Sequence, residues 1–241
     1  MDGGRQRDRT GGATVIDGAS GYLSIDLSAL ARNYEKLAAE VAPARAAAVV
    51  KADAYGLGAG RVAAKLHAHG CRHFFVAQFV EAISLRPLLA PDATVFVLNG
   101  LQPGNEPACA RENIVPVINS LEQWHAWRDA AKLLGRTLPA VLQFDTGMSR
   151  LGIPPQECAA LASLVGADSS IDVLFLMSHL ASADDPASEQ NDDQRAEMDR
   201  VAAVFPGFDV CFANSGGIFL GKSYHGALAR PGIALYGGAP T

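Results

Sequence analysis

The sequence is short of charged residues and has no excess of basic ones. Of its 241 residues, 19% are charged, where about 25% is usual, and 20 Lys and Arg against 25 Asp and Glu give a formal net charge of −5. There is no basic stripe that could neutralise a run of phosphates, so nucleic-acid binding lacks an electrostatic basis. Hydrophobic residues make up 49% of the chain, which excludes disorder for its bulk. We therefore expect a folded protein with a small-molecule partner.

Cysteine is scarce too, and the long apolar runs of a membrane protein are lacking. The 4 cysteines lie far apart without a C-x-x-C pair, which argues against a thiolate zinc site and against a disulfide framework. No stretch reaches the roughly 18 uncharged residues of a membrane span. Residues 1–20 resemble neither a signal peptide nor a transit peptide. We expect a cytoplasmic protein with no membrane partner and with residues 1–20 as a disordered tail.

From Tyr22 onward, short apolar runs alternate with longer Ala- and Leu-rich segments of helical period, a pattern typical of βαβ units. The short runs are almost continuously apolar, as expected for parallel strands that are covered on both faces. The expected strands are residues 46–50, 73–77, 94–98, 115–118, 140–144, 173–177, 210–213 and 233–236. The expected helices are residues 59–68, 121–134, 155–164 and 188–204, and Ser28 is expected to cap a further helix before the first strand.

Eight strands alternating with helices favour a closed (β/α)8 TIM barrel over an open doubly wound sheet for residues 21–241. An open dinucleotide-binding sheet carries a G-x-G-x-x-G turn after a strand, whereas Gly56, Gly58 and Gly60 have a different spacing and follow a charged segment. In a barrel the catalytic residues lie at the carboxyl ends of the strands.

Polar residues follow almost every expected strand: Lys51, Gln78, Asn99, Asn119, Asp145, His179 and Asn214, with Gly237 and Gly238 after the last. For Gln78 and Asn119 an ordinary polar loop is the simplest interpretation. Lys51 directly follows A-A-A-V-V, and an apolar surrounding favours the neutral amine that can form a Schiff base. Taken alone, however, a lysine at a strand end is more often a surface or ion-paired residue.

Two segments near the end of the chain are rich in glycine. One follows the seventh expected strand, and the other contains the eighth. N-S-G-G at 214–217 offers the Ser215 hydroxyl and backbone N–H groups at an expected helix start, and R-P-G-I-A-L-Y-G-G occupies 230–238. Each could be an ordinary glycine turn, but barrel phosphate sites are frequently built from the loops after strands seven and eight. A phosphate site and a Schiff-base lysine on one rim point to pyridoxal 5′-phosphate.

The segment V-V-K-A-D-A-Y-G-L-G at 49–58 resembles the cofactor-lysine signature of alanine racemases, which are pyridoxal-phosphate-dependent enzymes of fold type III. D-T-G-M-S-R-L-G at 145–152, S-H-L-A-S-A-D at 178–184, A-N-S-G-G at 213–217 and R-P-G-I-A-L-Y-G at 230–237 match further motifs of that family in the same order. The resemblance covers the chain from Tyr22 to its last residue. It implies an isomerase that interconverts L- and D-alanine and supplies D-alanine for bacterial cell-wall peptidoglycan. It also implies a homodimer for the full-length family.

Residue by residue, the resemblance implies that Lys51 holds the cofactor covalently and is one of two acid/base groups. The cofactor phosphate would be bound by the Tyr55 and Ser215 hydroxyls and by the backbone N–H groups of Gly232 and Ile233.

For the cofactor ring, the resemblance implies that Arg150 contacts the phenolic oxygen and the substrate. Arg230 would face the pyridine nitrogen, and His179 would hydrogen-bond toward Arg230. A guanidinium keeps its proton, so Arg230 would donate a hydrogen bond without protonating the ring, which weakens the ring as an electron sink. The other residues that the resemblance implies at the cofactor are Leu98, Asn214 and Tyr236.

Two departures from the family stand out. The family continues past the equivalent of Thr241 into a second, mostly β domain, which supplies a tyrosine across a head-to-tail dimer as the second acid/base group. Because racemisation needs such groups on both faces of a planar carbanion, we expect the 241-residue chain by itself to be a weak or inactive racemase. Secondly, Gln143 stands where some members carry a modified lysine that orients the arginine, so no such modification is expected.

Two other functions are compatible with such a barrel: a non-catalytic pyridoxal-phosphate carrier or homeostasis protein, and an amino-acid decarboxylase. The motifs R-P-G-I-A-L-Y-G and D-T-G-M favour the racemase. No metal site is expected, since the histidines of H-A-H-G-C-R-H at 67–73 are separated by a turn, and the acidic stretch 184–193 is interpreted as a solvated loop with a helix start. Trp124 and Trp127 are expected to pack in the core.

Overall fold

A computed structural model describes Gly18, Ser20, Gly21 and residues 23–240. The expected disordered tail, residues 1–20, therefore lies almost entirely outside the described residues. Of the helices described, none combines the length and the apolar character needed to cross a membrane.

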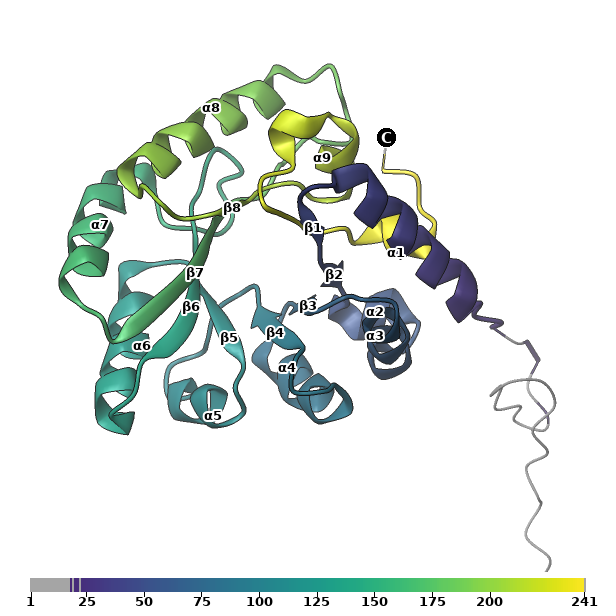
Figure 1. Ribbon diagram of the computed structural model, residues 1–241, viewed down its shortest axis with the longest axis horizontal. Helices are drawn as coiled ribbons and strands as arrows, with labels where there is room; N and C mark the ends of the chain where they lie inside the picture. Colours follow the sequence, from purple (N-terminus) through teal and green to yellow (C-terminus); the bar gives the residue numbers. More distant parts are fainter. Residues whose placement is uncertain (1–17, 19, 22, 241) are drawn as a thin grey trace, which may run out of the picture.

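A ring of parallel strands forms the centre of the molecule, with helices around it (Figure 1). Within the larger sheet each strand pairs with the next one along the chain, for example β3 with β4, where Phe74 lies opposite Val95. In the order of the larger sheet the strands are β2 (Ala48–Val49), β3 (His73–Val76), β4 (Thr94–Val97), β5 (Val115–Ile118), β6 (Leu138–Gln143), β7 (Ile171–Met177) and β8 (Val210–Cys211).

The ring is closed by β9 (Leu228–Ala229), which pairs in parallel with β1 (Arg45–Ala46), the strand directly before β2. On its other side, backbone hydrogen bonds run from Ala227 N–H to the Val210 carbonyl at 2.7 Å and from Arg230 N–H to the Ala213 carbonyl at 2.8 Å. These bonds join β9 to the β8 segment, so the (β/α)8 barrel expected from the sequence is confirmed.

The helices lie outside the ring and bury one face against it. They are α1 (Leu27–Val41), α2 (Lys51–Gly56), α3 (Ala59–Ala68), α4 (Phe79–Leu85), α5 (Glu106–Arg111), α6 (Leu121–Leu134), α7 (Cys158–Ala167), α8 (Glu189–Val204) and α9 (Ser215–Phe219), with 3-10 turns η1 (Arg86–Leu88), η2 (Pro155–Glu157), η3 (Lys222–Tyr224) and η4 (Ile233–Tyr236). The expected helices 59–68 and 121–134 are confirmed with the same bounds, while 155–164 begins as η2 and continues as α7. In α6, Trp124 and Trp127 are buried as expected.

Large side chains fill the interior of the barrel. Phe75 and Phe96 stack there with ring centroids 4.5 Å apart, and Phe175 packs on Phe96 at 5.5 Å. The barrel is therefore a packed core and no channel, which leaves the ends of the strands and their loops as the place for a site.

Two expectations about the elements are wrong. Residues 233–236 form the 3-10 turn η4, and the last strand is β9, earlier in the chain. The run I-A-L-Y is continuously apolar like a covered strand, but Leu235 N–H bonds back to the Gly232 carbonyl and the Leu235 carbonyl accepts from Asn33 of α1 at 3.0 Å. This tertiary contact with α1 overrides the local pattern.

The second correction concerns the start of α1. The cap is Asp26, whose carboxylate accepts from the N–H groups of Ser28 and Ala29 at 2.8 and 3.0 Å. Ser28 lies inside the first turn. Asp and Ser are comparable caps, and the negative charge of Asp26 is additionally favoured by the helix dipole.

Candidate active site

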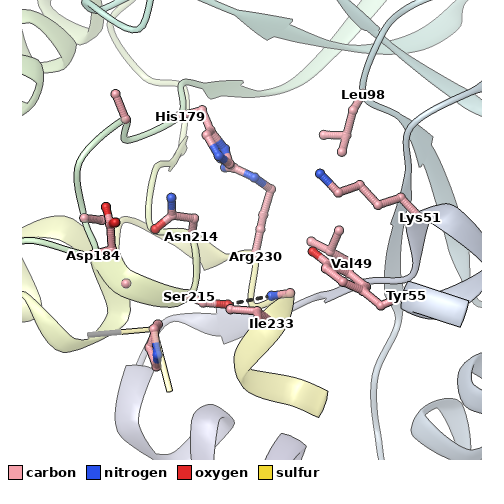
Figure 2. Close-up of a pocket in the computed structure, with 15 residues that line it drawn as sticks. Val49, Lys51, Tyr55, Leu98, His179, Asp184, Asn214, Ser215, Arg230 and Ile233 are labelled. Carbon is pink, nitrogen blue, oxygen red and sulfur yellow. Dashed lines mark hydrogen bonds between the residues drawn. The ribbon is translucent and has the colours of Figure 1, made fainter. Parts of the chain in front are cut away.

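A cavity of about 230 Å³ opens at the carboxyl ends of the strands (Figure 2). Lys51 enters it from one side, and Asn214 and Ser215 lie on the other, with Arg230 between them. The sequence-predicted residues that line it are Lys51, Tyr55, Leu98, His179, Asn214, Ser215, Arg230, Gly232 and Ile233. Segments from five places in the chain thus meet at one cavity, as the barrel topology requires.

Sequence reasoning did not single out every residue of this cavity. Gly216 of the predicted N-S-G-G segment lines it as well, and so do five residues that were not singled out: Val49, Ala181, Ala183, Asp184 and Pro240. Asp184 belongs to the acidic stretch that was interpreted as a solvated loop, and its side chain is exposed at the mouth of the cavity. Only its position at the end of the S-H-L-A-S-A-D motif could have indicated a place at the site.

The cavity lysine begins a left-handed turn. The residues Ala52 to Tyr55 have φ between 52° and 56°, so the α2 segment winds left-handed directly after Lys51. A residue with a Cβ atom loses roughly 1–2 kcal/mol in this conformation, and none of these residues is glycine. The turn brings Lys51 and Tyr55, at its two ends, to the same cavity.

The Ser215 hydroxyl forms the most defined polar corner. Its oxygen accepts from Gly232 N–H at 2.8 Å and from Ala234 N–H at 3.2 Å (Figure 2 shows the first bond). A hydroxyl has two acceptor lone pairs and one O–H donor, so both lone pairs are engaged and the hydrogen of this buried group is left to donate.

The Gly232 backbone is closely approached by the end of the Tyr55 side chain. A Cβ atom there would come 2.4 Å from the Tyr55 hydroxyl oxygen. The Tyr55 hydroxyl therefore lies against the Gly232 backbone, beside the Ser215 corner. Two hydroxyl donors on one side of the cavity make a place for an anion.

Arg230 lies almost fully buried in a nest of backbone carbonyls. Its guanidinium donates to the carbonyl of Ser178 at 2.5 Å, to the carbonyl of Cys211 at 2.7 Å and to the Cys211 Sγ at 3.0 Å. A further contact, at 3.4 Å, joins it to Nδ1 of His179. A guanidinium has only donors, so Nδ1 must accept and the proton of a neutral His179 sits on Nε2.

His179 is held in its neutral form. Desolvation by burial, together with the charges of Arg230, Arg150 and Lys51, lowers the pKa of His179 to about 3. A second proton on this ring would face three cations in a poorly solvated place. The sequence-based expectation that His179 lies beside Arg230 agrees with this geometry.

An amide of α8 fixes the loop that carries His179. Gln194 is buried; its Oε1 accepts from Ala181 N–H at 2.8 Å and its Nε2 donates to the His179 carbonyl at 2.9 Å. The same Nε2 contacts Thr146 Oγ1 at 3.2 Å. The loops after β6 and β7 are thereby tied to one side chain.

Arg150 and Tyr236 are the two sequence-predicted site residues outside the cavity lining. Arg150 is exposed and follows a turn in which the Asp145 carboxylate accepts from Gly147 and Ser149 N–H, both at 3.0 Å. Tyr236 donates to the Val49 carbonyl at 2.8 Å and packs on Tyr55 with ring centroids 4.7 Å apart. Tyr236 therefore supports the cavity from behind, and a contact of Arg150 with cofactor or substrate stays a prediction. Gln143 is buried at the end of β6.

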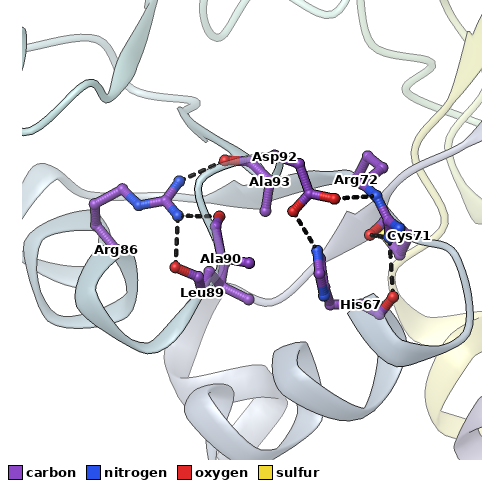
Figure 3. Close-up of polar contacts among 8 residues, drawn as sticks. All are labelled: His67, Cys71, Arg72, Arg86, Leu89, Ala90, Asp92 and Ala93. Atoms are coloured by element: carbon purple, nitrogen blue, oxygen red, sulfur yellow. Dashed lines mark hydrogen bonds and ion pairs between the residues drawn. The ribbon is translucent and has the colours of Figure 1, made fainter.

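The histidine-rich segment 67–73 does not form a metal cluster. His67 bonds to Asp92 at 2.7 Å, and Asp92 also pairs with Arg72 at 2.8 Å (Figure 3). His69 pairs with Glu35, on α1, at 2.7 Å. Within the described part of the chain, no three His, Cys, Asp or Glu side chains come together in a metal-binding group.

Fold and cavity together define a (β/α)8-barrel protein with a lysine and an anion-binding corner at the carboxyl ends of its strands. The chain belongs to the family described as alanine racemase, N-terminal domain, whose model matches residues 25–240.

Known proteins similar to the chain are longer than it is. The catabolic alanine racemase of Rhizobium johnstonii is 66% identical over 241 residues, which cover 100% of this chain and 64% of that protein. The alanine racemase of Brucella ovis is 57% identical over 219 residues, or 91% of this chain and 55% of that one. The crystal structure of the alanine racemase of Bartonella henselae with covalently bound pyridoxal phosphate superposes with a TM-score of 0.86 at 42% identity, covering 90% of this chain and 63% of that chain. The chain therefore spans less than two thirds of the length of these relatives.

Proposed function

We propose that the chain is the cofactor-binding barrel of a pyridoxal-phosphate-dependent alanine racemase. The Ser215 corner carries the proposal, because a buried hydroxyl with both lone pairs engaged offers its hydrogen to an anion a short way across the cavity from a lysine. The relatives named alanine racemase, one of them with covalently bound pyridoxal phosphate, support the same substrate and cofactor.

The residues present fit this cofactor. The Ser215 and Tyr55 hydroxyls would hold its phosphate, and the Lys51 amine would bind it covalently. Leu98 and Val49 give the cavity apolar walls, which suit an aromatic ring.

Each polar residue has a defined task in the proposed reaction. Pyridoxal phosphate supplies the electron withdrawal that makes the α-proton of a bound amino acid removable. Lys51 moves this proton on one face of the substrate. Arg230, fixed by carbonyls and in contact with neutral His179, would donate a hydrogen bond to the ring nitrogen without releasing a proton.

The biological setting belongs to the proposal too. The name of the Rhizobium relative favours a catabolic use of the reaction, while the supply of D-alanine for peptidoglycan stays a prediction from the resemblance. A homodimer, a cytoplasmic location and a barrel unit over residues 21–241 are likewise proposed. The four cysteines are free and buried, which is compatible with a reducing compartment.

The first test is covalent trapping. The 241-residue chain is mixed with pyridoxal phosphate and reduced with borohydride. We expect the label on the peptide that contains Lys51, because Lys51 lines the cavity and Lys65, Lys132 and Lys222 do not. A Lys51→Ala variant should lose the label, whereas Lys222→Ala should keep it. Labelling of Lys65, Lys132 or Lys222 in the wild type would contradict the assignment.

Chemistry on the substrate is followed by NMR. With the cofactor bound, the α-proton should exchange in heavy water for the one enantiomer of alanine whose α-proton faces Lys51, and the Lys51→Ala variant should abolish the exchange. Release of carbon dioxide instead would favour a decarboxylase, and cofactor binding without exchange would favour a carrier protein.

A further inference from the structure

We propose that Glu81, a residue of α4 outside the cavity, is a positioning residue for Lys51 and Tyr55. Its carboxylate holds the left-handed turn at whose ends these two residues stand. The inference rests on the proposed function, in which Lys51 binds pyridoxal phosphate and Tyr55 its phosphate group.

The Glu81 carboxylate joins two neighbouring loops of the barrel. Its Oε1 accepts from Ala52 N–H at 2.6 Å, and its Oε2 accepts from Ala77 and Gln78 N–H, both at 2.8 Å. The loop after β2 is thus attached to the loop after β3. Because a peptide unit is planar, a bond to Ala52 N–H also fixes the carbonyl end of Lys51.

The left-handed turn needs such support from outside. Its residues have Cβ atoms and lie at φ between 52° and 56°, which is unfavourable for L-residues. Conformations of this kind persist only where the surroundings determine them. Asp53 holds the far end, where its carboxylate accepts from Ala59 N–H at 2.7 Å, and Glu81 holds the end next to Lys51.

The bond to Ala52 distinguishes this role from ordinary helix capping. Glu81 lies in the first turn of α4, and its bonds to Ala77 and Gln78 would suffice to stabilise the start of that helix. The bond from Ala52 comes from a different loop, the one after β2, and uses the second oxygen. Glutamine has one acceptor oxygen, so Glu81→Gln cannot keep both sets of bonds and turns an NH₂ group toward an N–H donor.

The experiment measures pyridoxal phosphate binding and trapping in the 241-residue chain. For Glu81→Gln we expect a dissociation constant at least about tenfold higher, equal to about 1.4 kcal/mol, and a slower appearance of borohydride-fixed label on Lys51. Glu106→Gln is the matched control, because the Glu106 carboxylate accepts from Gly104 N–H at 2.8 Å in another loop and contacts no residue of the turn. It should stay within about twofold of the wild type.

Ala52→Gly separates positioning from stability. Glycine adopts positive φ without a steric penalty, so the double variant Glu81→Gln/Ala52→Gly should recover at least about threefold of the lost affinity. If Glu81→Gln lowers the melting temperature but binds and traps the cofactor like the wild type, or if Ala52→Gly gives no recovery, Glu81 is only a helix cap and the proposal fails.

Two further outcomes have fixed meanings. If Glu81→Gln does not fold, Glu81→Asp replaces it, since the shorter side chain keeps both oxygens but cannot reach Ala52 and its own loop together; wild-type trapping in that variant overturns the inference. If the wild-type chain itself traps no cofactor at Lys51, both the proposed function and the positioning role fail. If the wild-type chain traps the cofactor and Glu81→Gln does so equally well, only the positioning role fails.

Discussion

Arg230 and His179 lie in contact in a buried place, where the arginine is charged and the histidine is neutral. The guanidinium is satisfied by carbonyls, while burial and nearby cations lower the pKa of His179 to about 3. A neutral histidine can accept a hydrogen bond from Arg230 and adds no positive charge to the cavity.

The low pKa of His179 predicts a pH dependence of stability. In the unfolded chain the pKa of a histidine is about 6.5, so between that value and about 3 the unfolded chain binds more protons than the folded one. The free energy of unfolding should therefore fall as the pH falls through this range. In His179→Gln the slope should be shallower by up to about 1.4 kcal/mol per pH unit, measured by urea unfolding between about pH 4 and pH 6.

A second buried histidine bears on this result. Burial also lowers the pKa of His73, to about 4, so a slope of the same sign should remain in the His179 variant. Equal slopes for His179→Gln and wild type would show that His179 titrates normally in the folded protein.

At the scale of elements, α9 packs so closely on the loop after β7 that it has no room for a side chain at its second position. A Cβ atom on Gly216 would lie 2.4 Å from the Ala183 carbonyl oxygen and 2.7 Å from its carbon. Both contacts are with backbone, which cannot turn aside. The loop 181–184 and the Ser215 corner are therefore positioned by one glycine.

Gly216→Ala should lower the free energy of unfolding by about 1–3 kcal/mol and weaken pyridoxal phosphate binding, because α9 must move away from the loop. Gly166→Ala in α7 is the matched control: a Cβ atom there meets nothing within 4 Å. Alanine is the better helix former, so this control should be neutral or up to about 1 kcal/mol more stable. Denaturant unfolding of both variants decides, and equal stabilities would mean that the close approach at Gly216 is not a constraint.

Some helices and strands could be predicted from the sequence pattern, and others could not. The strand 115–118 and the helices 59–68 and 121–134 were predicted with their observed bounds, because hydrophobic periodicity and burial agree there. η4 was predicted as a strand because its run is apolar like that of a covered strand, but its Leu235 carbonyl accepts from Asn33 of α1, far away in the chain. Local pattern could not show that contact.

The same limit applies to the site. Lys51, Tyr55 and Ser215 were found from motifs that remain contiguous in the sequence. Glu81 was not, since the residues it binds, Ala52 on one side and Ala77 on the other, are brought together only by the pairing of β2 with β3. That the Ser215 hydroxyl is left to donate its hydrogen likewise depends on two N–H groups from a turn that is distant in the sequence.

For the whole molecule, cofactor binding should appear as added stability. A ligand at a hundred times its dissociation constant raises the free energy of unfolding by about 2.7 kcal/mol. If Ser215→Ala weakens pyridoxal phosphate binding roughly tenfold to a hundredfold, the same concentration should add only about 0.4–1.4 kcal/mol to that variant. Urea unfolding with and without the cofactor measures both differences.

The control for this prediction is Ser163→Ala, which removes an exposed hydroxyl bonded to the Ala159 carbonyl at 3.0 Å on α7. It should keep the full increase. An increase in Ser215→Ala as large as that of the wild type would remove the Ser215 hydroxyl from the binding site.

Because β9 closes the ring by pairing with β1, the barrel can close only late in the synthesis of the chain. The chain leaves the ribosome N-terminal end first, and β3 to β8 can each pair with the strand before it as they emerge. The β1 edge, however, waits for residues near Leu228, and the Tyr236 hydroxyl meets Val49 across 187 positions of chain. Until then the nascent protein is an open sheet with two unpaired edges, the state in which strands are most prone to pair with another molecule. Lys51 is made early but faces Arg230 only after closure, so we expect the proposed cofactor to bind only late in the maturation of the protein.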